Sequence, residues 1–254
     1  MRILAVVNQK GGVGKTTVTL GLASAAQAAG LRTLVIDLDP QANATAGLGL
    51  WDPTETVDDA LAADDLGSLK TCIVNSGWPT GPGRVVDVAP STPRRAQREP
   101  ILATDPIGAQ DRLRLALDGC SYDLVLIDCP PSLGLLTVNA LFASTDLLVV
   151  TEPAAWSSDG VEQILANARR IAARRDGSPR LAGIVINRLA RTRDAGYWRD
   201  QLVEQHGDSI IGVIRQRAAI TEAAAQSLPI HGLKRTGADE AMVEFDGLLK
   251  ALNL

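Results

Sequence analysis

Residues 10–17 read Lys10-Gly11-Gly12-Val13-Gly14-Lys15-Thr16-Thr17, and this stretch decides the fold. A short apolar run over residues 3–7 precedes it, and an alanine- and leucine-rich segment over residues 18–29 follows it. This is the strand, turn and helix order of a phosphate-binding loop. The glycines let successive N–H groups point inward, and the helix adds the positive end of its dipole. Lys15 is predicted to reach the β- and γ-phosphates, and the Thr16 hydroxyl to bind Mg²⁺. The whole stretch is therefore predicted to bind a nucleotide; a glycine-rich turn without a ligand is the alternative.

One position departs from the usual loop pattern. Gln9 stands where a first glycine normally precedes four variable residues and the Gly-Lys pair. Lys10 follows it, and a second lysine inside the loop repels Lys15 unless an anion lies between them. Alternatively, Lys10 points outward and reaches the phosphates of a nucleotide held by a second copy of the chain, as an arginine finger does elsewhere.

The size and composition predict one α/β domain over residues 1–254. With 254 residues, 46% of them hydrophobic, the chain can bury one sizeable core. Its net charge of -4 means that contact with nucleic acid requires a local basic face. Cys72, Cys120 and Cys129 lack C-x-x-C spacing, which favours neither a disulfide framework nor a zinc site and agrees with a reducing cytoplasm. The N-terminal apolar run is interrupted too early for a signal peptide, and no run approaches the length of a membrane span.

Aspartates end two further apolar strands. Residues 33–37 are predicted to form a buried parallel strand closed by Asp37, and alternation turns Asp39 to the same side. Residues 122–128 form a second such run closed by Asp128, the Walker B pattern in which the aspartate meets the Mg²⁺ shell. Strand ends beside a phosphate loop are where doubly wound sheets bind ligands. The alternative for Asp37 and Asp39 is a turn or cap, but their place beside the loop favours a role in metal binding or in orienting the attacking water.

The remaining apolar segments complete a doubly wound α/β fold, a mostly parallel sheet flanked by helices. Strands are predicted over residues 84–88, 146–152 and 180–188, and helices over residues 51–69, 107–117 and 160–173. Asn187 ends one of these strands, where its amide can read an adenine edge; a strand-end turn asparagine is the alternative. Ala190 lies where a guanine reader would need a carboxylate, so ATP is favoured over GTP.

Three segments together resemble the ParA family of DNA-partitioning ATPases. They are residues 10–17, the stretch Asp37-Leu38-Asp39-Pro40-Gln41-Ala42-Asn43-Ala44-Thr45, and the stretch Ile127-Asp128-Cys129-Pro130-Pro131-Ser132. The first belongs to the wider deviant Walker A group, whereas the second is more particular to ParA. The resemblance covers nearly the whole chain and looks like the short form without an N-terminal helix-turn-helix, because the strand before the loop begins at once.

The resemblance implies a dimer that ATP closes face to face, with Lys10 of each subunit contacting the nucleotide of the other. It implies that Asp39 positions the attacking water, so that the catalytic residues are Lys10, Lys15 and Asp39. The residues assigned to Mg²⁺ are Thr16, Asp37, Asp39 and Asp128. The residues assigned to the nucleotide beyond the loop are Asn187 and Arg188.

Arginines are concentrated between residues 160 and 235, where DNA contact is therefore expected. The segment Ala190-Arg191-Thr192 resembles a family loop implicated in DNA binding. Because few aromatics lie between them, these arginines suit phosphate contact rather than base stacking. A solvated helix face is the ordinary explanation for about half of them. The DNA-binding candidates are Arg191, Arg193, Arg215, Arg217, Lys234 and Arg235.

The predicted function is a Mg²⁺–ATP-dependent plasmid or chromosome partitioning ATPase, cytoplasmic and nucleoid-associated. It would bind DNA non-specifically as a dimer, and a ParB-type centromere-binding partner would stimulate slow hydrolysis. The main alternative is a MinD-like ATPase of the membrane surface, which needs a basic amphipathic C-terminal helix, whereas residues 239–250 are amphipathic but acidic, so that core packing is favoured. An iron–sulfur carrier needs a second cysteine matched to Cys129, and a small-molecule synthetase leaves the arginines without a role.

Overall fold

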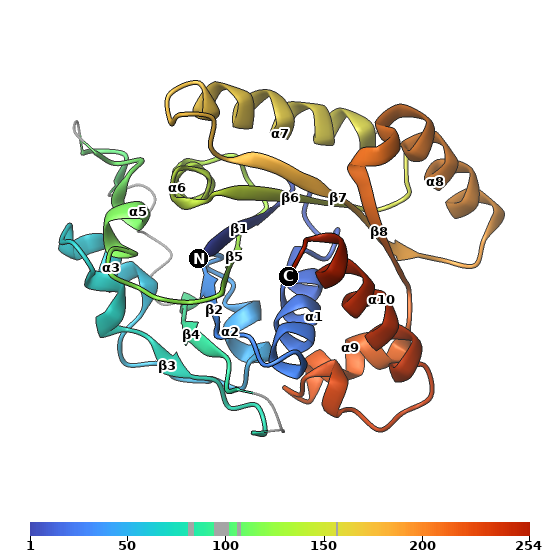
Figure 1. Ribbon diagram of the computed structural model, residues 1–254, viewed down its shortest axis with the longest axis horizontal. Helices are drawn as coiled ribbons and strands as arrows, with labels where there is room; N and C mark the ends of the chain where they lie inside the picture. The colour runs from blue at the N-terminus through green and yellow to red at the C-terminus, as the bar shows by residue number, and fades with distance from the viewer. Residues whose placement is uncertain (81–83, 94–101, 106–107, 156) are drawn as a thin grey trace.

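One eight-stranded sheet organises the chain, with strand order β3-β4-β2-β5-β1-β6-β7-β8 (Figure 1). The structure, a computed structural model, describes residues 1–80, 84–93, 102–105, 108–155 and 157–254. The described strands pair in parallel, except that β3 runs antiparallel to β4. The strands are β1 (Arg2–Val7), β2 (Thr33–Asp37), β3 (Val74–Asn75), β4 (Asp87–Ala89), β5 (Leu124–Asp128), β6 (Asp146–Thr151), β7 (Arg180–Leu189) and β8 (Ile210–Arg215). The predicted doubly wound, mostly parallel sheet is confirmed.

Helices cover both faces of this sheet, which explains why its central strands are apolar throughout. Along β1, Ile3 and Ala5 face one core, and Leu4 and Val6 face the other. The first core receives α3 (Val57–Ala63), α5 (Arg112–Ala116), α6 (Leu135–Ala143) and α7 (Ser157–Ala172). The second receives α1 (Lys15–Ala28), α2 (Asn43–Gly47), α9 (Ala218–Ala225) and α10 (Ala238–Ala251). The remaining elements are α8 (Arg193–His206) and the short 3-10 helices η1 (Ser68–Thr71), η3 (Gly207–Ser209) and η4 (Ile230–Gly232).

Most predicted elements lie where the sequence places them, and the differences have local causes. The helix expected over residues 51–69 is shorter, because Thr56 and Asp59 form a capping box that starts α3 and Asp64 ends it in a left-handed conformation. The strand expected over residues 84–88 begins only at Asp87, where pairing with β2 starts. The helix expected over residues 107–117 is reduced to α5, and its first residue lies outside the described part of the chain.

The C-terminal helix packs as predicted. In α10 the apolar face, which includes Phe245, Leu248 and Leu249, is buried in the second core beside α1. Asp239 and Glu240 remain exposed in its first turn, where negative charge favours the helix dipole. No helix in the described ranges is both long enough and apolar enough to cross a membrane.

A pair of glycine substitutions tests the contact between α1 and α10. A Cβ on Gly21 would lie 2.1 Å from Cε1 of Phe245, whose ring is fully buried and cannot move aside. We expect Gly21→Ala to lower the free energy of unfolding by about 1–3 kcal/mol. Gly196→Ala in α8 is the matched control, because a Cβ there meets no atom within 4 Å and should add up to about 1 kcal/mol of helix propensity. Urea denaturation measures both; equal effects would contradict the packing.

Candidate nucleotide site

The loop between β1 and α1 has the backbone that an anion cradle requires. Gly12 and Gly14 have φ angles of +83° and +87°, which side-chain-bearing residues rarely adopt. Helix α1 begins at Lys15, directly after this turn, so its N-terminal N–H groups face the space enclosed by the loop. The predicted strand, glycine turn and helix order is therefore present.

Two residues at the end of β7 hold this loop from behind. The Asn187 side-chain Nδ2 donates to the carbonyl oxygen of Val13 at 2.8 Å, and the Arg188 guanidinium donates to the carbonyl of Gly12. A Cβ on Gly14 would lie 2.1 Å from Asn187 Nδ2, so only glycine allows this approach. Because the loop carbonyls are engaged on this side, the N–H groups remain for a ligand. Contact of Asn187 with adenine stays a prediction, since its buried amide is already bonded to the loop.

Asp37 and Asp128 end neighbouring strands and lie directly opposite each other in the pairing of β2 with β5. Both are completely buried. Asp37 accepts from the backbone N–H and hydroxyl of Thr45, at 2.8 and 2.7 Å. Asp128 accepts from the hydroxyls of Thr16, at 2.7 Å, and Thr19, at 3.2 Å. The two carboxylates that the sequence places 91 residues apart are thus brought to one spot beside the loop.

The electrostatics of this spot favour a bound cation. Burial raises the pKa of Asp37 and of Asp128, and the charge of Asp37 raises the pKa of Asp128 further. Burial also lowers the pKa of the Lys15 ammonium, while the nearby charge of Asp128 opposes that shift. Within the described ranges neither carboxylate has an ion-pair partner. Two buried acids so close together require compensating positive charge to be ionised.

The donor set suits Mg²⁺. No group of three or more His, Cys, Asp or Glu side chains in the described part of the chain is arranged to hold a metal alone. Mg²⁺ does not require one, because it keeps several waters and is bound through one or two carboxylates and the phosphates of its substrate. Thr16 and Asp128, already hydrogen-bonded to each other, supply oxygen atoms of that kind. Asp39 is 8% exposed, and its Oδ1 accepts from the N–H of Gln41.

A cleft of about 480 Å³ lies in front of the loop. Its walls include Gly14, Lys15, Thr16, Asp39 and Pro131. A second hollow of about 410 Å³ shares Thr17, Arg188 and Ala224 with it and extends to Asn187, Arg215 and Arg217. Of the predicted phosphate loop, Gly12, Gly14, Lys15, Thr16 and Thr17 line the first hollow, and the second continues from it toward the ends of β7 and β8.

Comparison with known proteins agrees with this geometry. A sequence model of the AAA domain matches residues 1–180. The sporulation initiation inhibitor protein Soj of Bacillus subtilis is 33% identical over 244 residues, covering 90% of each chain. The chromosome-partitioning ATPase Soj of Thermus thermophilus is 36% identical over 225 residues, covering 88% of this chain and 84% of that protein. The chain belongs to the ParA family of P-loop ATPases.

Solved structures share the fold of this ParA-family chain. A McdA variant of Cyanothece in complex with ATP superposes with a TM-score of 0.84 at 20% identity, over 100% of this chain and 97% of that chain, which shows the fold alone. Cobyrinic acid a,c-diamide synthase of Mycobacterium smegmatis, with a bound ATP analogue and magnesium, gives 0.75 at 29% identity, over 98% and 95%. The septum site-determining protein MinD of Pyrococcus horikoshii, with Mg-ADP, gives 0.74 at 25% identity, over 98% and 94%.

The signature lysine of this ParA-family chain lies outside its own cleft. The Lys10 Nζ is 2.6 Å from Oε1 of Glu152, at the end of β6, and does not line either hollow. The backbone N–H of Lys10 donates to the Asn8 side chain at 2.8 Å, and Asn8 in turn donates to the carbonyl of Val150 at 2.6 Å. The Lys10 side chain thus points away from its own cleft, and its contact with the nucleotide of a second copy stays a prediction.

Sequence reasoning missed four residues that build the site: Asn8, Thr19, Thr45 and Glu152. Thr45 ends the ParA-like stretch of residues 37–45, so its place in that stretch was an available signal. Its hydroxyl also accepts from the N–H of Ser91 at 2.9 Å, which ties the loop after β4 to Asp37. Glu152 had no such signal, because 142 residues separate it from Lys10.

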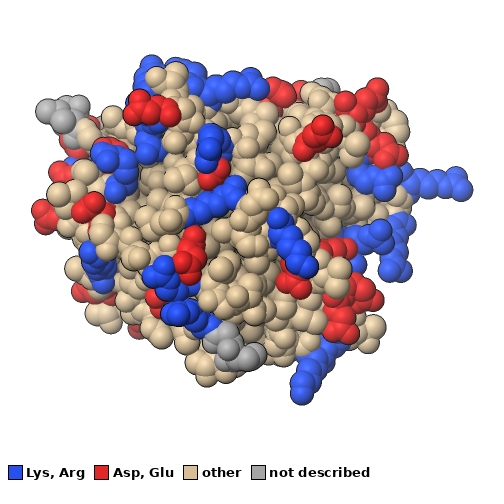
Figure 2. All heavy atoms as spheres, viewed as in Figure 1, with Lys and Arg blue, Asp and Glu red and all other residues tan. Residues whose placement is uncertain are grey.

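The six DNA-binding candidates differ in their availability. Figure 2 shows basic side chains along the edge formed by α7 and at the end of the molecule near α8. Arg217 is bound in bidentate fashion by Glu244, at 2.5 and 2.8 Å, and Arg215 also lies beside that carboxylate. Arg235 is paired with Glu222. Of these six candidates, Arg191, Arg193 and Lys234 are exposed and have no acidic partner in the described ranges. DNA binding by all six stays a prediction, and the free three are favoured.

Substitution of Thr45 tests the support of Asp37. We expect Thr45→Val to lower the free energy of unfolding by about 1–3 kcal/mol, because a buried carboxylate loses a donor and the Ser91 N–H loses its acceptor. We expect it also to weaken binding of Mg-ADP, measured by calorimetry. Thr45→Ser keeps the hydroxyl and should retain nucleotide affinity. Wild-type affinity in Thr45→Val would show that this hydroxyl does not shape the site.

Proposed function

We propose that this ParA-family chain is a Mg²⁺–ATP-dependent partitioning ATPase whose ATP-bound form is a face-to-face dimer. In this proposal the dimer binds DNA non-specifically at the nucleoid, and a ParB-type centromere-binding partner stimulates slow hydrolysis. The chromosome-partitioning ATPase Soj of Thermus thermophilus, which is among its relatives, supports this role. The solved neighbours that contain nucleotide and magnesium support the choice of cofactors.

The observation that carries the proposal is the position of Lys10. A lysine that served its own nucleotide would line its own cleft, as Lys15 does. The Lys10 side chain instead lies outside this cleft and is 51% exposed, and within the described part of the chain its one ion-pair partner is Glu152. An exposed pair of this kind contributes little to stability and is readily exchanged. The side chain is therefore available to a phosphate presented by a second copy.

The chemistry assigned to the other residues follows from their surroundings. Lys15 and the loop N–H groups would bind the phosphates, and Thr16 and Asp128 would hold a Mg²⁺ ion, whose positive charge would stabilise negative charge on the phosphates. Asp39 lines the cleft beside Lys15 with a carboxylate oxygen bonded to the Gln41 N–H, so it is placed to orient a water. Asp37 supports this loop, since it also accepts from the Asp39 N–H at 3.1 Å.

The structure gives the membrane-surface alternative less support. A helix that binds a bilayer needs a free apolar face and a basic polar face. In α10 the apolar face is occupied by the core, and the exposed first turn carries Asp239 and Glu240. Co-sedimentation with anionic liposomes in the presence of ATP distinguishes the two roles, and binding there would favour the MinD-like one.

The proposal is tested by measuring mass and DNA affinity of Asp39→Ala, which should retain ATP because it lacks the group that orients water. Light scattering should show a dimer with Mg-ATP and a monomer with ADP. DNA affinity should rise with ATP and fall steeply with salt, because phosphate contacts release counterions.

The double variant Arg191→Glu with Arg193→Glu should abolish this DNA binding. Lys70→Glu is the control, since this exposed lysine lies beside Gly67 and Gly119, away from the candidates.

Three results would each contradict part of the proposal. A monomer under all nucleotide conditions would remove the sandwich dimer and with it the role of Lys10. DNA affinity that is independent of ATP, or insensitive to salt, would contradict the proposed DNA binding but leave the proposed ATPase activity unaffected. Normal turnover by Asp39→Ala would take that residue out of catalysis.

Glu152 should restrain dimer formation, because it competes with the partner's phosphate for Lys10. We expect Glu152→Gln in the Asp39→Ala background to lower the ATP concentration for half-maximal dimerisation by roughly two- to fivefold, the range set by an exposed ion pair. Glu204→Gln is the matched control on α8, where the carboxylate contacts Gln201. Analytical ultracentrifugation across an ATP titration measures the effect. Unchanged dimerisation in Glu152→Gln would show that the ion pair does not compete.

A further inference from the structure

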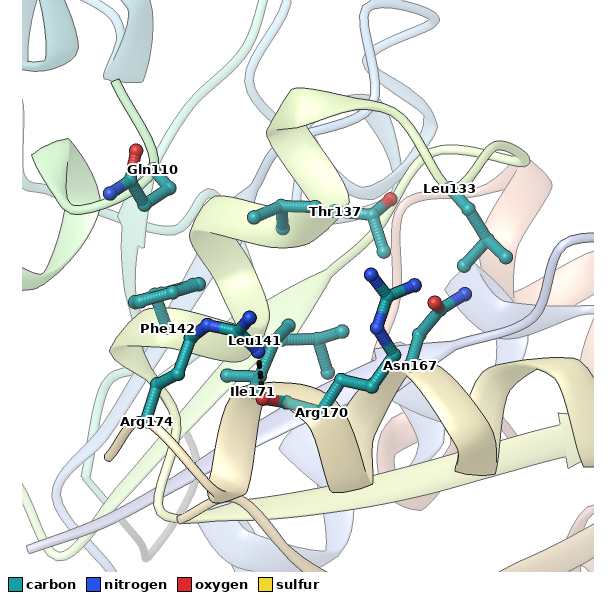
Figure 3. A pocket seen from close by; sticks show the side chains of 10 residues that line it. Gln110, Leu133, Thr137, Leu141, Phe142, Asn167, Arg170, Ile171 and Arg174 are labelled. Atoms are coloured by element: carbon teal, nitrogen blue, oxygen red, sulfur yellow. Dashed lines mark hydrogen bonds between the residues drawn. The ribbon is translucent and has the colours of Figure 1, made fainter. Parts of the chain in front are cut away.

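A third hollow, remote from the phosphate loop, lies between α6 and α7. It encloses about 380 Å³. Figure 3 shows α6 and α7 forming two of its sides, with the Arg170 guanidinium reaching from α7 toward Thr137 on α6. The apolar side chains that line it are Leu133, Val138, Leu141, Phe142 and Ile171. Its volume is within the range of ligand and anchor pockets.

The charge at this hollow is one-sided. Arg170, near the end of α7, and Arg174, in the turn that follows this helix, line the hollow and are both exposed, whereas none of its described lining residues is Asp or Glu. Arg174 donates to the backbone carbonyl of Arg170 at 2.8 Å, and neither guanidinium has an acidic partner in the described ranges. Their neighbour Arg175 differs, because it caps the end of α6 by donating to the Ser144 carbonyl at 3.0 Å. Two cations thus remain unmatched beside an apolar floor.

The apolar lining and the two unpaired arginines together favour one class of ligand over others. A DNA phosphate would satisfy the arginines but leave the apolar floor in contact with water, and a small inorganic anion would do the same. An apolar centre with arginine at its edge is the arrangement of protein–protein contact sites. We propose that the groove between α6 and α7 docks an acidic segment of a partner protein. One large apolar side chain of that segment enters the hollow, and adjacent carboxylates bind Arg170 and Arg174.

The docking groove adjoins the loop that follows Asp128. Leu133 forms part of its wall, and the Thr137 hydroxyl in α6 donates to the carbonyl of Ser132 at 2.7 Å. Pro131, in the same loop, lines the nucleotide cleft. A segment bound in the groove therefore favours one arrangement of residues 129–133 and alters ATP turnover. This effect on turnover rests on the proposed ATPase function, whereas the docking itself does not.

The test is selection of short random displayed peptides on the full chain without nucleotide, followed by fluorescence polarisation with the selected peptides. We expect peptides rich in Asp and Glu around a Leu, Phe or Met. Arg170→Glu with Arg174→Glu should weaken their binding by about tenfold or more, as loss of a charged contact does. Arg169→Glu is the matched control, because that exposed residue on the same helix does not line the hollow. Thermal melting checks that the variants are folded.

Each remaining outcome overturns the proposal. Selection that yields no acidic-apolar peptides, or peptides that bind the double variant as well as the wild type, removes the groove as a docking site. A short DNA duplex that binds through Arg170 and Arg174 makes this face a phosphate contact instead. Succinate bound with the same arginine dependence, without any peptide, makes it a small-anion site. Because no ATP is present, failure here leaves the proposed function standing.

Discussion

The structure depends on one electrostatic constraint, the burial of two carboxylates side by side at the ends of β2 and β5. Asp37 and Asp128 are inaccessible to solvent, and hydroxyl donors from Thr16, Thr19 and Thr45 satisfy only part of their charge. Because water cannot screen them, burial raises the pKa values of both carboxyl groups. Both can be ionised together only when a cation lies beside them. A fold that keeps such a pair gives up stability in the absence of ligand and regains it when the positive charge arrives. The phosphate loop places an anion beside that cation.

Contacts from the neighbouring strands β6 and β7 hold the phosphate loop in its conformation. Its carbonyls are held by Asn187 and Arg188 at the end of β7, while its first residues are anchored through Asn8 to the end of β6. These anchors are effective because β1 lies between β5 and β6 in the sheet, with β7 next in order. The order of the strands is therefore part of the site: four neighbouring strand ends supply the aspartate, the loop and its two supports. A change that shifts β7 along the sheet would move the N–H groups of the loop without touching a ligand.

The sequence predicts the parts of the chain that are decided locally. Continuous apolar runs place β2 and β5, the glycine pattern places the loop, and the acidic but amphipathic tail predicts the buried face of α10. Helix α8 and strand β8 were not predicted. Helix α8 buries only Ala195 and Leu202, so its sequence shows no clear apolar period. The apolar run of β8 is short, and Gly212 interrupts it. Contacts between residues far apart in the sequence could not be predicted either. Asn187 and Val13 are 174 residues apart, and Arg217 and Glu244 are 27 residues apart. Charge alone predicts a basic surface, but pairing decides which arginines remain free on it.

Lys10 and Lys15 explain why the triphosphate, and not the diphosphate, would control pairing of subunits. In the proposed dimer, face-to-face closure would bring Lys10 of one copy toward Lys15 of the other, and two ammonium groups in a partly desolvated interface repel each other strongly. The terminal phosphate carries the charge that lies between them and turns this repulsion into two attractive contacts. Without that phosphate, Lys10 has the carboxylate of Glu152 on its own chain as the better partner. In this proposal the nucleotide would shift the equilibrium between monomer and dimer because it binds one arrangement of Lys10 better than the other, which is the condition that any ligand-driven switch must meet.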